Sequence, residues 1–124
     1  MQTILSAADT IDARSATRPR SWVQLSREFP EIVAAYDQLS DACRSAGPLD
    51  EAMVMLVKLA VSVGGRSSRT VHAHAKKARR AGADPATLRQ IALIALPTIG
   101  LPAALDALRW IDESIHEQAD ESPA

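Results

Sequence analysis

The side chains best suited to chemistry lie in one short segment, residues 66–74, which contains two arginines, two histidines and three hydroxyl-bearing residues. His74 can exchange protons near neutral pH, so it is the first candidate for a general acid or base. Ser67 and Thr70 precede it by seven and four residues, which places all three on one face of a helix. Two interpretations remain open: a polar site in which His74 is catalytic and the two hydroxyls help to bind a substrate, or a core histidine whose ring is satisfied by a backbone or hydroxyl partner.

Two arginines lie at the start of the same predicted helix, where free backbone amides also favour negative charge. Arg66 and Arg69 can bind carboxylates in bidentate fashion, so they are predicted to hold an anionic substrate. Glu51 lies in the first turn of the preceding predicted helix and is a possible acid/base partner of His74. A glutamate at that position is also favoured by the helix dipole alone, and both interpretations remain open.

The His-x-His pattern of His72 and His74 raises the question of a metal site. Residues two apart on a helix point ~200° from each other, and the segment has no cysteine or carboxylate, so no metal is predicted. Thr70 could act as a nucleophile with His74, but no nearby carboxylate would orient the imidazole. His72 is instead predicted to lie on a solvated basic strip, or on a surface that contacts an anion or a subunit, with Arg69, Lys76, Arg79 and Arg80.

Helices must position these residues, and the apolar spacing predicts an all-α protein, a compact bundle of five to six helices. The expected domain arrangement is an N-terminal arm over 1–20, one helical domain over 21–118 and an acidic tail over 119–124. The helix after Asp50 is apolar almost all round, so it is predicted to be central and largely buried. The expected helices start near Trp22, resume after Pro30, and then cover about 51–63, 68–81, 85–96 and 101–118, with caps at Asp50, Ser67 or Ser68, and Asp84.

Composition narrows the class of protein. The chain has 124 residues, of which 47% are hydrophobic and only 3% aromatic, which predicts a core of packed aliphatic helices. The net charge of −1 gives no general attraction to polyanions, although every charged residue between Glu51 and Asp84 is basic, which favours a local anion site. No apolar run reaches ~18 residues, so no membrane span is predicted. Cys43 is the single cysteine; it is expected to be buried and inert, in a cytoplasmic protein.

Residues 49–109 resemble the carboxymuconolactone decarboxylase and alkylhydroperoxidase D superfamily. The matching features are LAVS at the end of one helix, HAHAKKARRAGA through the end of the next, and TLRQIALIALPTIGLPAA after it. Each is weak by itself, but their order and spacing make the resemblance fairly specific. The resemblance implies an alkylhydroperoxidase D-like bundle that assembles as a homotrimer or homohexamer.

Peroxidase members of that superfamily carry a Cys-x-x-Cys pair, a histidine four residues after the second cysteine and a glutamate twelve residues before the first. Aligning the histidine with His74 places Ser67 and Thr70 at the cysteine positions and Met55 at the glutamate position. A hydroxyl is a poor nucleophile toward peroxide and cannot form the disulfide, so thiol peroxidase activity is not expected.

The decarboxylase branch of the superfamily also lacks the thiol pair and uses neither metal nor organic cofactor. The resemblance therefore implies a cofactor-free lyase, or a related acid/base enzyme, that acts on a small carboxylated molecule with His74 as proton donor. A non-catalytic, ligand-binding or scaffold member with a degenerate site is the alternative. Nucleic acid is not an expected partner, because the basic strip lacks base-reading side chains.

Overall fold

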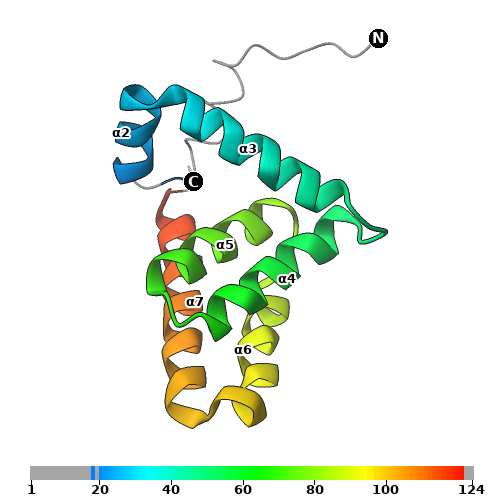
Figure 1. The fold of residues 1–124 in the computed structure, drawn as a ribbon. Helices are drawn as coiled ribbons and strands as arrows, with labels where there is room; N and C mark the ends of the chain where they lie inside the picture. Colours follow the sequence, from blue (N-terminus) through cyan, green and yellow to red (C-terminus); the bar gives the residue numbers. More distant parts are fainter. Residues whose placement is uncertain (1–17, 19, 122–124) are drawn as a thin grey trace. The chain divides into compact units, whose positions relative to one another are not determined.

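The computed structural model describes Arg18 and residues 20–121 of the chain (Figure 1). All regular secondary structure in these residues is α-helical, which confirms the all-α prediction. Most of the predicted N-terminal arm and the last residues of the predicted acidic tail lie outside the described part. The helices are α2 (Arg20–Glu28), α3 (Pro30–Ser45), α4 (Glu51–Gly64), α5 (Ser68–Arg80), α6 (Pro85–Ile99) and α7 (Leu101–Glu121).

The helices fall into two compact units. The first unit, Met1–Pro48, carries α2 and α3, and the second, Leu49–Ala124, carries α4 to α7. The single domain predicted over residues 21–118 includes helices of both units and stays a prediction.

Three helices of the second unit begin at the residues that the sequence indicated. A side-chain oxygen of Asp50 accepts a hydrogen bond from the Met53 amide at 2.8 Å, and Asp84 caps α6 through the Thr87 amide at the same distance. Ser67, rather than Ser68, caps α5. Each cap satisfies a backbone N–H group that the first helical turn leaves without a partner.

Two helix ends differ from the prediction. Helix α6 continues through Pro97 and ends before Gly100, whose φ of 94° requires glycine. Pro97 has no N–H group to donate to the carbonyl four residues earlier, so the helix loses one backbone hydrogen bond there and continues for only two more residues. Helix α7 continues to Glu121 instead of ending near Gln118, and the Gln118 side chain donates a hydrogen bond to the Lys76 carbonyl at 3.0 Å.

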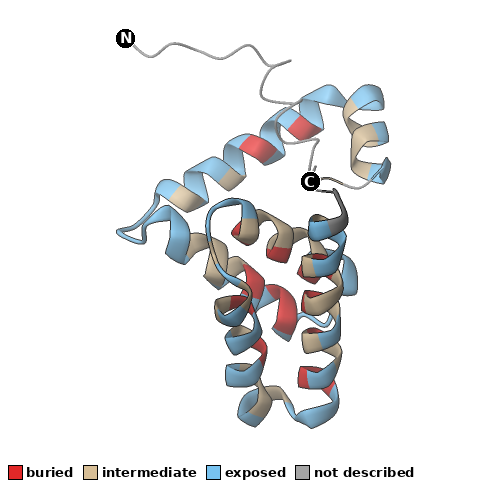
Figure 2. Ribbon diagram, turned by 180° about the vertical axis from the view of Figure 1, so that it is seen from behind, coloured by how far each residue is buried: buried red, intermediate tan, exposed pale blue. Residues whose placement is uncertain are grey.

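The core of the second unit lies where its four helices face one another. Helix α7 packs along both α5 and α6, and α4 packs against the same two helices (Figure 1). Figure 2 shows the buried residues on these facing sides. Alanines at the contacts let the helices approach closely, and larger aliphatic side chains fill the remaining space. The fully buried members include Leu59, Val63, Val71, Ala75, Leu88, Ala92, Ala107 and Ile111.

The prediction that α4 is largely buried is wrong for the single chain. Only Leu59, Ser62 and Val63 of this helix are buried, whereas Met53, Val57 and Val61 are 46%, 42% and 69% exposed. The physical reason is that α5 and α6 cover one side of α4 within the second unit. Its other side is apolar and open.

The predicted burial of Cys43 is also wrong. Within the first unit, α2 packs against the part of α3 that carries Val33 and Asp37, and the Trp22 ring meets Tyr36 edge-on at 5.0 Å. Val33 and Asp37 are buried, and Arg18 pairs with the Asp37 carboxylate. Cys43 follows the same apolar spacing as Val33, but it lies near the far end of α3 and is exposed.

None of the described helices is both long enough and apolar enough to cross a membrane.

Candidate functional site

The three sides of helix α5 have different surroundings. Val71, Ala75 and Ala78 are buried in the core. His72 and Lys76 lie to one side of this buried row and contact α7. By the 100° spacing of helical residues, His74 and Lys77 lie to the other side. The structure therefore separates the two histidines, as the helix geometry predicted.

His74 is partly buried, and its Nδ1 atom is enclosed without a hydrogen-bond partner. Burial lowers the pKa of this imidazole from 6.5 to about 4, with further contributions from the positive charges of Lys77 and Lys58. The expected pKa near neutral pH is therefore wrong. At neutral pH the ring is uncharged, so it can accept a proton or a hydrogen bond. It can act as a general acid only after it has taken up a proton and become the imidazolium cation.

Two lysines also act on His74, and the sequence alone did not assign them to the site. Lys77 follows His74 by one turn on α5, whereas Lys58 comes from the neighbouring helix α4. Lys58 follows Met55 by three residues and Glu51 by seven, so these three residues share one side of α4. The pairing of α4 with α5 was the missing information, because the spacing of either helix alone does not bring Lys58 to His74.

The hydroxyls predicted to bind a substrate form local hydrogen bonds at the start of α5. The Ser67 Oγ atom accepts a bond from the Thr70 amide at 3.4 Å, and the Thr70 hydroxyl donates to the Ser67 carbonyl at 3.1 Å. Thr70 is exposed and its hydroxyl does not point a proton at His74. These two residues cap a helix, and their substrate-binding role stays a prediction.

Of the two predicted arginines, Arg66 contacts α7. Arg66 has a φ of 61°, and its guanidinium donates to the Asp106 carboxylate of α7 at 2.9 Å. This ion pair competes with any anionic ligand for the same guanidinium. Arg69 is exposed, and Glu51 is exposed in the first turn of α4. Their proposed roles at the site stay predictions.

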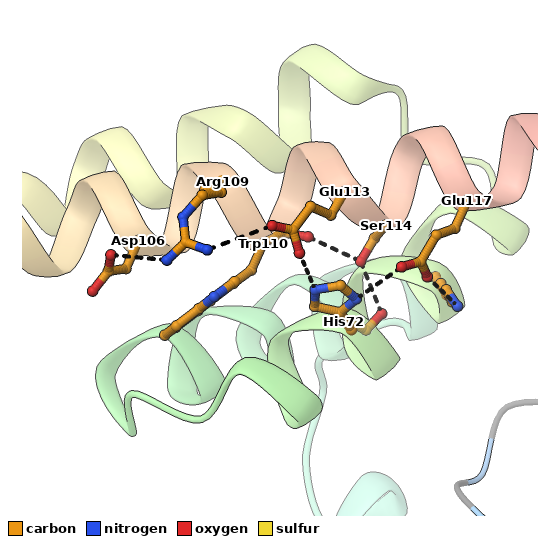
Figure 3. Close-up of polar contacts among 8 residues, drawn as sticks. His72, Asp106, Arg109, Trp110, Glu113, Ser114 and Glu117 are labelled. Atoms are coloured by element: carbon orange, nitrogen blue, oxygen red, sulfur yellow. Dashed lines mark hydrogen bonds and ion pairs between the residues drawn. The ribbon is translucent and has the colours of Figure 1, made fainter.

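The prediction of a solvated basic strip is wrong for His72 and Lys76, because acidic residues of α7 pair with them (Figure 3), whereas Arg69 and Arg80 are exposed. His72 Nε2 lies 3.0 Å from a Glu113 oxygen, and its Nδ1 lies 3.7 Å from Glu117. Lys76 binds Glu117 at 2.7 Å, and this hydrogen bond lowers the pKa of the Glu117 carboxyl. Both nitrogens of His72 thus face carboxylates, and the residue joins α5 to α7.

The same network extends along α7. Figure 3 shows Arg109 between two carboxylates, with Asp106 at 3.2 Å and Glu113 at 3.6 Å. Ser114 is buried, and its hydroxyl lies 3.1 Å from the Trp110 carbonyl and 3.4 Å from the His72 carbonyl. Within residue 18 and residues 20–121, no group of three ligand side chains could hold a metal ion. The network is therefore best described as an ionic contact between two helices.

The free energy of unfolding is expected to fall as the pH drops from about 6.5 to about 4. In this range the unfolded chain binds a proton at His74 and the folded chain does not. The stabilising contribution is therefore complete above pH 6.5 and is lost as the pH falls through about 4. The shift corresponds to ~3 kcal/mol, and solvent access to part of the ring reduces the expected effect to ~2 kcal/mol.

Urea unfolding of the wild-type protein and a His74→Leu variant, at about pH 7.5 and about pH 4, measures this contribution. The acid-induced loss of stability is expected to be ~2 kcal/mol smaller in the variant, because its side chain binds no proton. Equal losses in the two proteins would contradict the low pKa of His74.

Comparison with known proteins gives one match. A model of the Carboxymuconolactone decarboxylase family matches residues 30–113, which run from the start of α3 into α7 and include Met55 and His74. No curated protein and no solved structure matches the chain.

Proposed function

This chain belongs to the carboxymuconolactone decarboxylase family, and from this premise we propose that it is a cofactor-free lyase or related acid/base enzyme. Its substrate in this proposal is a small carboxylated molecule, and His74 is its acid/base residue. The observation that carries the proposal is the environment of His74. A neutral, partly buried imidazole lies among positive charges from two helices, which attract an anion to a group that can exchange protons.

The charge around His74 explains how an anionic substrate would activate it. Burial most of all, and then the charges of Lys77 and Lys58, disfavour the protonated imidazole in the free protein. A substrate carboxylate placed beside them offsets their charge and raises the pKa of His74, so binding promotes uptake of a proton. The substrate thereby converts His74 into the proton donor that a lyase needs.

A decarboxylation at this site would proceed as follows. The bond between the carboxylate and its neighbouring carbon breaks, CO2 leaves, and the electron pair moves into a carbonyl conjugated with that carbon. Nearby lysine ammonium groups stabilise the negative charge that develops on the carbonyl oxygen. The carbon then takes the proton from the His74 imidazolium, which returns to its neutral form. Every group used belongs to the chain or the substrate.

Thiol peroxidase activity is not part of the proposal. Ser67 and Thr70 supply hydroxyls where a peroxidase of this superfamily would need thiolates, and both hydroxyls already take part in hydrogen bonds at the helix start. Cys43 belongs to α3 and has no second cysteine in the chain with which to form a disulfide.

The alternative is a non-catalytic member that binds a ligand or serves as a scaffold. One observation favours it: the residue at the family's glutamate position is Met55, so no carboxylate from that position is available to assist His74. Under this alternative, the same lysines would bind an anion without turnover.

A turnover screen separates these two functions. The purified protein would be incubated with small carboxylic acids and carboxylated lactones, and CO2 release and product formation would be followed by NMR. Conversion of one compound, above the rate in buffer alone, supports the enzyme. Binding of carboxylates near His74 without conversion of any compound in the panel would contradict catalysis and support the ligand-binding alternative.

We also propose that the protein is a homo-oligomer, a trimer or hexamer, in the cytoplasm. The exposed apolar residues Met53, Val57 and Val61 recur at helical spacing on one side of α4, and a second copy of the chain would cover them. A monomer mass by light scattering at micromolar concentration would contradict the assembly. Recovery of the native protein outside the cytoplasmic fraction would contradict the location.

A further inference from the structure

We propose that the ligand of the His74 site is an amphipathic carboxylic acid, whose apolar part occupies a cavity between α4, α5 and the start of α6. This inference rests on the proposed function, which places the carboxylate of the ligand beside His74. It goes beyond that function because it also places the apolar part of the ligand. The carboxylate lies beside Lys58, His74 and Lys77, and the apolar part extends from there into the cavity.

The cavity has a volume of about 220 Å³ and lies within the second unit. Its walls are almost entirely apolar. The Thr87 hydroxyl is the one polar side-chain group among them, and it already donates a hydrogen bond to Asp84 at 3.0 Å. The wall includes Ala52, Met55, Leu56, Ala78, Ala81 and Thr87. Such a cavity offers no partner to a charged group and favours an apolar one.

Helix register connects the cavity to the charged site. On α5, Ala78 and Ala81 follow His74 by four and seven residues, so they lie one and two turns along the same side of the helix. On α4, Met55 precedes Lys58 by three residues. Met55 and Ala78 line the cavity, and Lys58 and His74 lie one turn away from them along the same sides of the paired helices α4 and α5, so the charged residues lie next to the cavity. Lysine side chains therefore border one end of an otherwise apolar site.

The volume sets the size of the apolar part. An apolar protein cavity of ~150 Å³ holds one benzene molecule. A cavity of about 220 Å³ therefore accommodates an aromatic ring or a short alkyl chain, but not the chain of a long fatty acid. The turn at Gly82, whose φ is 108°, is part of the wall and closes the helix at this end.

Calorimetric titration with a homologous series tests the inference without requiring turnover. The probes are acetate, butanoate, hexanoate, octanoate, benzoate and hexanamide. We expect the Kd to fall about threefold to fourfold for each added methylene until the cavity is full, and then to stop falling. Hexanamide, which lacks the charge, is expected to bind at least about tenfold more weakly than hexanoate.

Two variants show whether the apolar part lies in the cavity. Met55→Ala enlarges the cavity and is expected to move the plateau to a longer acid. Ile94→Ala removes an exposed side chain of α6 that is not part of the cavity wall, so it is the matched control and should leave the series unchanged. Circular dichroism of both variants would establish that they are folded. The same plateau in both would overturn the inference.

The remaining outcomes distinguish this inference from the proposed function. If carboxylates bind with a Kd that does not depend on chain length, or if none binds, the inference is wrong whatever the turnover screen shows. If the chain-length dependence is found but no compound is converted, the amphipathic site stands and the catalytic function fails.

Discussion

A His74→Gln variant is expected to lose at least about 100-fold in kcat/KM toward the substrate that the wild-type protein converts. Glutamine has a similar size and keeps a hydrogen-bonding amide, but it cannot exchange a proton. The loss should appear mainly in kcat, because Lys58 and Lys77 remain and still attract the carboxylate. Steady-state kinetics of the two proteins measure it, and an unchanged kcat would exclude His74 as the acid/base residue.

Thr70→Val is the matched control for this experiment. Thr70 precedes His74 by one turn, is exposed, and uses its hydroxyl to donate a hydrogen bond to the Ser67 carbonyl. Removing that hydroxyl should change kcat/KM by less than about fivefold, since the bond is local to the helix start. A loss as large as that of His74→Gln would instead indicate that the hydroxyl takes part in the chemistry.

The pH dependence of the kinetics provides a second readout of His74. In the free enzyme the pKa of its imidazole is about 4, so the corresponding limb of the kcat/KM profile lies at acidic pH. An anionic substrate raises this pKa, so the limb in the kcat profile is expected at higher pH. Limbs at the same pH would show that the bound carboxylate does not lie close to His74.

Replacing Ile111 by alanine is expected to lower the free energy of unfolding by roughly 2–5 kcal/mol. Ile111 is fully buried in α7, within the cluster that includes Leu59, Val71 and Leu88. Removing its side chain forfeits the burial of three carbon atoms and leaves a cavity that rigid neighbouring helices close only in part. Urea unfolding followed by circular dichroism measures the change.

Leu105→Ala is the control for this change on the same helix. Leu105 is 53% exposed, so its truncation removes little buried surface, and we expect a loss below about 1 kcal/mol. A similar loss at both positions would show that the core of the second unit does not depend on Ile111. If Leu105 alone were sensitive, burial of α7 by another chain would be the explanation.

The sequence by itself determined the helices that carry the site. Asp50, Ser67 and Asp84 cap α4, α5 and α6, and each accepts a hydrogen bond from the backbone amide three residues later. Such signals act within one helical turn, so they can be read from consecutive residues. The opposite placement of His72 and His74 was predictable for the same reason, because the helix repeat alone sets it.

The tertiary structure decided what surrounds each side chain. Arg66 binds Asp106, which is 40 residues away, and His72 meets Glu113, which is 41 residues away. Periodicity shows that a side of a helix is apolar, but it does not show whether another helix covers it, which is why Cys43 and much of α4 are exposed. His74 depends on such distant contacts most of all. The sequence alone shows that residue 74 is a histidine. Its low pKa comes from burial and from lysines on two helices, and only packing brings these together.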